Sequence, residues 1–255
     1  MLLAIDIGNT ETTLGVFQGE ELRATWRLAT RFHRVADEYA ALLMKLLEHR
    51  SLKLADISDI AMCCVVPPLL STFTDMCRRY FNVTPLVVGT GTKTGVRIRM
   101  DNPREVGADR IVNTAAAHRL YGGPVIITDF GTATTFDVVS KEGDYLGGAI
   151  APGIGTAAEA LFMRAAMLPR VELTHPIHVI GTSTTTAMQS GIIYGYIGLV
   201  EGIVSRIQKE LGEKTKVVAT GGYSEIIANE TSIIDAVNPD ITLIGLRLIY
   251  GMNQP

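Results

Sequence analysis

The sequence predicts an α/β protein made of two similar halves. Short apolar runs that read as β-strands alternate with longer segments of helical periodicity along its 255 residues. A strand, a D-x-G turn and a second strand also occur twice, with the turns at Asp6–Gly8 and Asp129–Gly131. The two aspartates are 123 residues apart, which is about half of the chain. Two copies of one unit predict a duplicated fold with a cleft between its halves.

In the first half, three strands are expected before the first helix. The first apolar run ends at Asp6, and Gln18–Glu21 is typical of a hairpin turn. Between Asp37 and Arg50 the apolar residues recur every three or four positions, which indicates a helix. The pair Pro67-Pro68 is expected to end the next strand. The expected strands are Leu2–Ile5, Leu14–Phe17, Leu22–Leu28, Ile60–Val66 and Thr84–Val88, and the expected helices are Asp37–Arg50 and Leu69–Tyr80.

The second half repeats this order. It begins near Tyr121–Pro124 with an apolar strand that leads into the second D-x-G turn, and Glu142–Asp144 is typical of a hairpin turn. Two domains are therefore expected at residues 1–118 and 119–255, closely packed because no low-complexity linker separates them. The expected strands are Val125–Thr128, Phe136–Val139, Tyr145–Ile150 and Val217–Thr220, and the expected helices are 155–167, 184–210, Ser224–Asn229 and Thr242–Tyr250.

The composition excludes several classes of protein. Hydrophobic residues make up 47% and charged residues 19%, so the chain can bury a core and is not disordered. A net charge of −3 provides no basic field for nucleic acid. No apolar stretch approaches the roughly 20 residues that span a bilayer. The three cysteines lack a C-x-x-C spacing, which argues against a disulfide scaffold and a zinc site. We therefore expect a soluble cytoplasmic protein with no nucleic-acid or membrane partner.

The D-x-G turns suit a nucleoside triphosphate. A carboxylate at a strand end can hold a cation, and the glycine lets the backbone approach a phosphate. The Asn and Thr residues that follow can donate to phosphate oxygens. Either turn alone is equally consistent with an ordinary hairpin, whereas two copies in register favour phosphate binding. The alignment of the copies pairs Thr12 with Thr135 and Val16 with Val139.

The paired turns resemble those of the actin-like ATPase superfamily, in which two ribonuclease-H-like domains face one ATP. Val217–Tyr223 is similar to the adenosine-binding strand and Gly-Gly turn of that superfamily. Longer motifs resemble type III pantothenate kinases, namely DNPREVGADRIVN at 101–113, DFGTATTFD at 129–137, GGAIAPGI at 147–154 and AMQSGIIYGY at 187–196. The resemblance runs from Met1 to near Tyr250. It implies ATP-dependent phosphorylation of pantothenate to 4'-phosphopantothenate, the first step of coenzyme A biosynthesis.

The resemblance also implies the residues that bind ATP and its cations. It places Asp6 near ATP bound with Mg2+, which would neutralise phosphate charge during transfer. It makes Asp129 a ligand of the monovalent cation that the family needs, K+ or NH4+. The implied ATP-binding residues are Asp6, Ile7, Gly8, Asn9, Thr10, Glu11, Thr12, Thr13 and Thr132.

Pantothenate is implied to bind at a loop that contains Asp109. In the family this aspartate is the general base, which takes the proton of the attacking hydroxyl. Arg110 would bind the anionic end of the substrate or steady the γ-phosphate. From spacing alone, the favoured role of Asp109 is to N-cap a helix that runs to Leu120, and the two roles are compatible. The implied substrate-binding residues are Met100, Gly107, Ala108, Asp109, Arg110 and Thr184.

Thr184 matches a position that touches pantothenate from the neighbouring subunit, so the resemblance implies a homodimer. A local role stays open, because one hydroxyl within Thr182–Thr186 could cap the following helix. Glycines at 191, 195, 198 and 202 favour close helix packing, either at a subunit interface or within one chain.

The sequence departs from the family pattern at two of these positions. Met100 stands where the family usually has a tyrosine, and methionine cannot donate a hydrogen bond. Glu11 adds negative charge beside the expected phosphates. Two other functions therefore stay open: another small-molecule kinase of the superfamily, and a catalytically weak or inactive member that acts as a regulatory ATP-binding protein.

Overall fold

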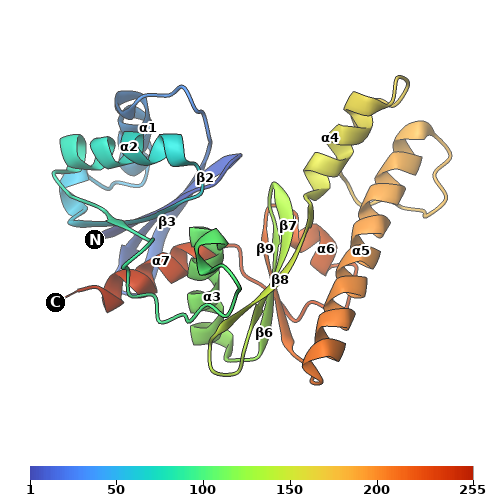
Figure 1. The fold of residues 1–255 in the computed structure, drawn as a ribbon. Helices are drawn as coiled ribbons and strands as arrows, with labels where there is room; N and C mark the ends of the chain where they lie inside the picture. Colours follow the sequence, from blue (N-terminus) through green and yellow to red (C-terminus); the bar gives the residue numbers. More distant parts are fainter. Residues whose placement is uncertain (255) are drawn as a thin grey trace. The chain divides into compact units, whose positions relative to one another are not determined.

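The computed structural model describes residues 1–254, which form two compact units (Figure 1). Unit 1 contains Met1–Val96, Asn102–Ala116 and the chain from Ile241 onward, and unit 2 contains Arg97–Asp101 and Ala117–Asp240. The change of unit after residue 116 lies close to the expected boundary at 118/119. The C-terminal helix, which the sequence placed in the second domain, belongs instead to unit 1, because its apolar side chains complete the core of that unit.

Unit 1 is built on a five-stranded sheet in the order β3-β2-β1-β4-β5. Its strands are β1 Leu2–Ile7, β2 Glu11–Gln18, β3 Glu21–Ala29, β4 Asp59–Cys64 and β5 Leu86–Val87. β1 pairs antiparallel with β2 and parallel with β4, so the C-terminal ends of β1 and β4 meet at one edge. Asp6 lies at this edge, opposite Cys63 in the parallel register.

Helices cover both faces of this sheet. They are α1 Ala36–His49, α2 Pro67–Met76, the first part of α3 Ala108–Tyr121, and α7 Ile241–Met252. One face packs on α1 and α2 through side chains such as Leu43 and Phe73, and the other packs on α3 and α7 through Val112 and Leu246. Because successive side chains of a strand point to opposite faces, Asp6 follows Ala4 onto the face that α3 covers.

The prolines at 67 and 68 begin a helix, which corrects the view that they only end a strand. β4 stops at Cys64, and α2 starts at Pro67. Proline suits the first turn of a helix, because its missing N–H would have no partner there. The expected helix Leu69–Tyr80 therefore starts two residues earlier, and it finishes in a π-helical turn at Cys77–Phe81.

Unit 2 repeats the strand arrangement of unit 1. Its sheet has the order β10-β9-β6-β7-β8. Its strands are β6 Val125–Phe130, β7 Ala133–Val139, β8 Tyr145–Pro152, β9 Lys216–Gly221 and β10 Ala236–Val237. β6 pairs antiparallel with β7 and parallel with β9, as β1 does with β2 and β4. The duplication expected from the two D-x-G turns is therefore confirmed.

The core of unit 2 is closed by a long helix. Its helices are α4 Ile154–Arg164, α5 Thr184–Leu211 and α6 Ser224–Ala228. Among residues 1–254, α5 is the one helix that is long and apolar enough to cross a membrane by length and composition. Ile193, Val200 and Val204 on α5 are fully buried with Phe130 and Phe136 of the sheet. These contacts are typical of the core helix of a globular unit.

The two D-x-G turns differ in length by one residue. Asp6 lies opposite Thr13 on β2, whereas Asp129 lies opposite Thr135 on β7. The position equivalent to Thr135 is therefore Thr13, and the sequence pairings of Thr12 with Thr135 and of Val16 with Val139 are wrong by one position. The extra residue enlarges the first turn, between Ile7 and Glu11.

Candidate functional site

The first D-x-G turn is held by hydrogen bonds from β2 and from the end of β3. The Gly8 amide donates to the Glu11 carbonyl (3.0 Å), and the Thr30 hydroxyl donates to the Gly8 carbonyl (2.8 Å). The Thr30 amide donates to the Thr10 carbonyl (2.9 Å). Asn9 and Thr10 are exposed between these bonds. The turn therefore offers polar groups from a fixed frame, as phosphate binding requires.

The other residues assigned to ATP lie on the strands that flank this turn. Ile7 and Thr12 are fully buried, and the Thr12 hydroxyl lies 2.9 Å from that of Thr30. Their side chains therefore support the turn from within the core. Thr13 is partly exposed and lies opposite Asp6, on the same face of the sheet.

Asp6 ends β1 beside a buried thiol. Cys63 Sγ donates to Asp6 Oδ1 (3.2 Å). The pKa of Asp6 is raised to about 7, chiefly by burial and also by the charges of Asp109 and Glu11, while the Cys63 bond acts to lower it. Burial and the charge of Asp6 hold the pKa of the Cys63 thiol well above its usual value, so the thiol remains a donor. Negative charge thus gathers at this edge, and the carboxylate oxygens of Asp6 are of the type that Mg2+ takes.

Asp109 stands at the start of α3. The helix begins at Ala108, so Asp109 is its second residue, and the N-cap position suggested by the sequence is incorrect. Asp109 Oδ1 accepts a hydrogen bond from the Arg110 amide (2.9 Å) in the first turn of the helix, and the same amide also donates to the Gly107 carbonyl (3.1 Å). Burial raises the pKa of Asp109, and the Arg110 amide and guanidinium oppose this shift. A carboxylate with a raised pKa near Asp6 is suited to accept a proton.

The negative charge of Glu11 is partly balanced by an arginine on the neighbouring strand. Its Oε2 lies 3.6 Å from Nε of Arg27 on β3, and both side chains are about half exposed. The negative charge that the sequence places beside the expected phosphates is therefore offset by a cation of the same unit.

The second D-x-G turn brings Asp129 together with two hydroxyl residues. Asp129 lies in register with Thr135 on β7 and with Thr220 on β9, so the three side chains share one face. Gly221 has φ +89°, and a Cβ there would lie 2.6 Å from Asp129 Oδ1. A carboxylate and two hydroxyls are oxygen donors of the type that a hard cation takes.

Thr132 is held at the tip of this turn by the start of α4. Its carbonyl accepts from the Gly153 amide (3.1 Å) and from the Thr156 hydroxyl (2.8 Å). Gly153 is the N-cap residue of α4, and a Cβ there would lie 2.4 Å from the carbonyl oxygens of Gly131 and Thr132. The turn and the helix can therefore meet this closely only because residue 153 is a glycine.

We expect Gly153→Ala to destabilise unit 2 by about 1–3 kcal/mol, because the added methyl must push the turn from the helix. The same displacement should raise KM for ATP, since Thr132 moves with the turn. Thermal unfolding and initial-rate kinetics measure the two effects. Gly222→Ala is the stability control, because a Cβ there meets no described atom within 4 Å. An unchanged Tm for Gly153→Ala would contradict the prediction.

The N-terminus of α5 is capped by Ser183. The Ser183 hydroxyl accepts from the Thr186 amide (3.2 Å), and the Thr186 hydroxyl accepts from the Ser183 amide (3.0 Å). The capping role that the sequence left open within Thr182–Thr186 therefore belongs to this pair. Thr184 is exposed and lines a hollow of about 810 Å³ with residues of α4 and α5.

The remaining residues assigned to pantothenate divide between the two units. Gly107, Ala108 and Arg110 are partly exposed around Asp109 in unit 1, where the Arg110 amide donates to the Gly107 carbonyl (3.1 Å). Met100 lies in unit 2, in the short segment Arg97–Asp101.

A dedicated metal cage is absent from residues 1–254, where no three His, Cys, Asp or Glu side chains converge. Mg2+ rarely needs such a cage. It keeps several waters and commonly binds through one or two carboxylates together with substrate phosphates. Asp6, beside the first D-x-G turn, is a carboxylate of the kind that such a site uses.

Several residues that support the site were not predicted, because they lie outside every motif recognised in the sequence. Cys63, Thr30 and Arg27 contact Asp6, the first turn and Glu11 respectively. Cys63 reaches Asp6 through the parallel pairing of β4 with β1, whereas Arg27 and Thr30 approach Glu11 and the first turn through the β2–β3 hairpin. The available signals were that Cys63 stands near the end of an apolar run expected to be a strand and that Arg27 lies in the expected strand Leu22–Leu28.

Comparison with solved structures defines the class of the fold. A Baf family protein from Campylobacter jejuni matches with a TM-score of 0.62 and 19% identity over 98% of each chain. An inorganic polyphosphate/ATP-glucomannokinase from Arthrobacter sp. strain KM matches with a TM-score of 0.52 and 12% identity over 99% of each chain. Together with the two similar five-stranded sheets, these likenesses show that the chain shares the duplicated α/β fold of these proteins.

The family follows from sequence similarity. The family model of the type III pantothenate kinases matches residues 2–206. A type III pantothenate kinase from Dehalococcoides mccartyi (strain CBDB1) is 57% identical over 253 residues, covering 99% of this chain and 96% of the relative. One from Moorella thermoacetica is 54% identical, with 99% and 100% covered. The chain belongs to the type III pantothenate kinase family, and the predicted enzyme class is confirmed.

Proposed function

We propose that the chain transfers the γ-phosphate of ATP to pantothenate, forming 4'-phosphopantothenate, with Asp109 as general base. The observation that carries the proposal is the acid pair of unit 1, in which the charge of Asp109 contributes to the raised pKa of Asp6. Family membership supports pantothenate as the acceptor. Coenzyme A biosynthesis is then the pathway that the product enters.

In the proposed reaction, the attacking hydroxyl gives its proton to Asp109 while its oxygen bonds to the γ-phosphorus and ADP leaves. The first D-x-G turn binds the phosphates through its amides and hydroxyls. Arg110 binds the anionic end of pantothenate or steadies the γ-phosphate. Mg2+, held through Asp6, supplies neutralising charge to the phosphates when bound. Catalysis is then mainly positioning and charge neutralisation.

We further propose a homodimer in which Thr184 reaches the neighbouring site. Around α4 and α5, unit 2 exposes large apolar side chains, namely Met163, Met167, Ile177, Val179 and Ile180. The glycines at 191, 195 and 198 are exposed, and a Cβ on any of them would meet no described atom within 4 Å. The close helix crossing within one chain, which the sequence left open, is therefore not formed by these three. Exposed apolar side chains and exposed small residues in this part of unit 2 support association between copies.

The proposed setting is the cytoplasm, where the free thiols of Cys63, Cys64 and Cys77 stay reduced. The regulatory alternative gains no support. The likeness to the Baf family protein is at 19% identity and shows the fold alone, whereas the relatives at 54–57% identity are named as kinases.

The proposal is tested by ADP release with pantothenate and MgATP, using K+ or Na+ as the monovalent cation. We expect turnover that depends on pantothenate and is faster in K+. Asp129→Ala should raise the K+ concentration for half-maximal rate about tenfold or more, because it removes the charged ligand. Equal rates in both salts would contradict the assignment of Asp129 as a ligand of a monovalent cation, but would leave the proposed kinase activity intact. Absence of turnover with pantothenate in any salt would overturn the proposal that pantothenate is the phosphate acceptor.

A further inference from the structure

The segment Arg97–Asp101 belongs to unit 2, although the chain on either side of it belongs to unit 1. It carries Met100, a proposed pantothenate contact, and Asp109 follows eight residues after its end. Methionine holds a substrate by packing alone, and such contacts weaken steeply with small displacements. The contacts that attach this segment to unit 2 therefore determine how well Met100 can hold a substrate.

The backbone of the segment adds to the edge of the β7–β8 hairpin. The Tyr145 amide donates to the Arg97 carbonyl and the Arg99 amide donates to the Tyr145 carbonyl, each at 2.8 Å. Tyr145 is fully buried, and its hydroxyl donates to Asp137 Oδ1 (2.9 Å) inside the sheet. The edge that receives the segment is therefore rigid, but only one residue, Ile98, forms the bridge.

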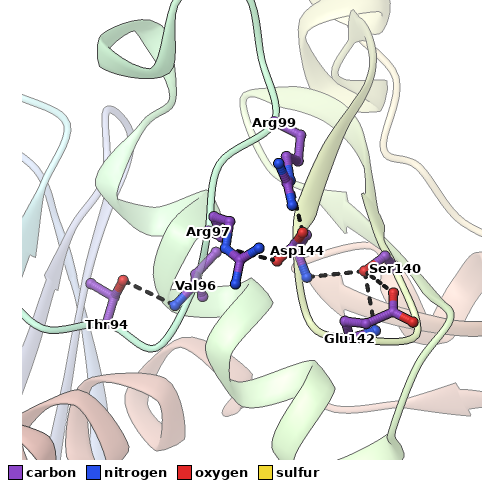
Figure 2. Close-up of polar contacts among 7 residues, drawn as sticks. All are labelled: Thr94, Val96, Arg97, Arg99, Ser140, Glu142 and Asp144. Atoms are coloured by element: carbon purple, nitrogen blue, oxygen red, sulfur yellow. Dashed lines mark hydrogen bonds and ion pairs between the residues drawn. The ribbon is translucent and has the colours of Figure 1, made fainter.

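One carboxylate supplements this short bridge. Arg99 Nε lies 2.8 Å from Asp144 Oδ2, and Arg97 Nε lies 3.7 Å from Asp144 Oδ1 (Figure 2). The Asp144 side chain is 15% exposed, so water competes weakly for it. Because side chains alternate along an extended segment, the two arginines share one side and Met100 lies on the other. There its sulfur is 3.8 Å from the place that a Cβ on Gly147 would take.

Asp144 is itself fixed by the turn that carries it. The Ser140 hydroxyl accepts from the amides of Asp144 (3.1 Å) and Glu142 (3.2 Å), and the Ser140 amide donates to the Asp144 carbonyl (2.8 Å). The Glu142 carboxylate accepts from the Ser140 hydroxyl (3.1 Å) and points away from the two arginines (Figure 2). Of the two acids in this turn, Asp144 contacts the segment Arg97–Asp101 and Glu142 does not.

We propose that Asp144, through Arg97 and Arg99, is a positioning residue for pantothenate. It fixes the segment Arg97–Asp101 so that Met100 is held in place over β8 before the substrate arrives. The proposal rests on the proposed function, since it takes Met100 as a pantothenate contact.

The test compares Asp144→Asn with Glu142→Gln, which removes the same charge from the same turn. Asp144→Asn should raise KM for pantothenate about fivefold to tenfold, while kcat and KM for ATP stay within about twofold. Glu142→Gln should leave all three unchanged. Arg99→Met should reproduce most of the effect, and adding it to Asp144→Asn should raise KM little further, because both substitutions remove the Arg99–Asp144 ion pair. A wild-type KM for pantothenate in Asp144→Asn would overturn the proposal.

Hydrogen exchange separates this proposal from the proposed function. The Arg99 amide, bonded to Tyr145, should exchange about fivefold faster or more in Asp144→Asn than in wild type or Glu142→Gln. Absence of pantothenate turnover in the wild type would overturn the proposed function, and the exchange rate would still decide whether Asp144 holds the segment. Unchanged exchange would overturn the positioning role whatever the kinetics show.

Discussion

Asp109→Asn is expected to lower kcat about 10²- to 10⁴-fold, the range over which a positioned general base contributes to a reaction. The asparagine side chain has nearly the same shape, and its oxygen can still accept from the Arg110 amide. The start of α3 should therefore fold as in the wild type. KM for ATP should change little, because the substitution removes the proton acceptor and leaves the proposed ATP-binding groups in place.

The pH dependence provides a second readout of the same residue. Since burial raises the pKa of Asp109, the wild-type rate should fall as the pH drops through this raised pKa, where the carboxylate becomes protonated. The residual rate of Asp109→Asn should lose that dependence. Asp75→Asn, an exposed acid on α2 of the same unit, is the control and should behave as wild type. An Asp109→Asn protein with the wild-type rate would show that the residue only satisfies a helix-end amide.

The sequence was sufficient to predict the features that depend only on residues close together in the chain. A strand that ends in Asp-x-Gly and returns as a second strand needs only a short apolar run and a turn. Both copies were visible for that reason. Asp6 and Asp129 accordingly lie at equivalent strand ends of the two units. The difference in turn length was missed, because an alignment anchored on the aspartates carries no information about strand register.

Features that depend on distant pairing were beyond the sequence pattern. The helix at Ile241–Met252 joins unit 1 because Leu243, Leu246 and Ile249 fill the face beside α3, and no local signal states which sheet an apolar helix will cover. The Cys63–Asp6 hydrogen bond likewise requires the parallel pairing of β4 with β1. The site was predictable as far as its residues are neighbours in the chain, and unpredictable where strands bring them together.

Asp6→Asn is expected to make the protein without ligands more stable at pH 8 while it weakens or abolishes activity. The folded-state pKa of Asp6 is about 7, well above the ordinary aspartate value of 3.8. Between these values the folded protein holds the proton more tightly than the unfolded chain does. The contribution of Asp6 to stability therefore falls as the pH rises from about 4 to 7 and stays unfavourable above pH 7. Asparagine carries no charge at any pH and removes this cost, which is at most about 4 kcal/mol.

Asp59→Asn is the matched control for Asp6→Asn, and its expected change in Tm has the opposite sign. Burial raises the pKa of Asp59 on β4, but hydrogen bonds with Ser58 and Tyr250 outweigh it, and the net pKa is lowered. Asp59→Asn should therefore lower the Tm at pH 8, whereas Asp6→Asn should raise it. The gain from Asp6→Asn should shrink toward pH 4 and disappear below about pH 3, where the aspartate is protonated in both states. Saturating MgATP should raise the Tm of the wild type more than that of Asp6→Asn, since binding a cation to a buried carboxylate offsets its cost. A lower Tm for Asp6→Asn at pH 8 would mean that this acid is held for the fold rather than for a cation.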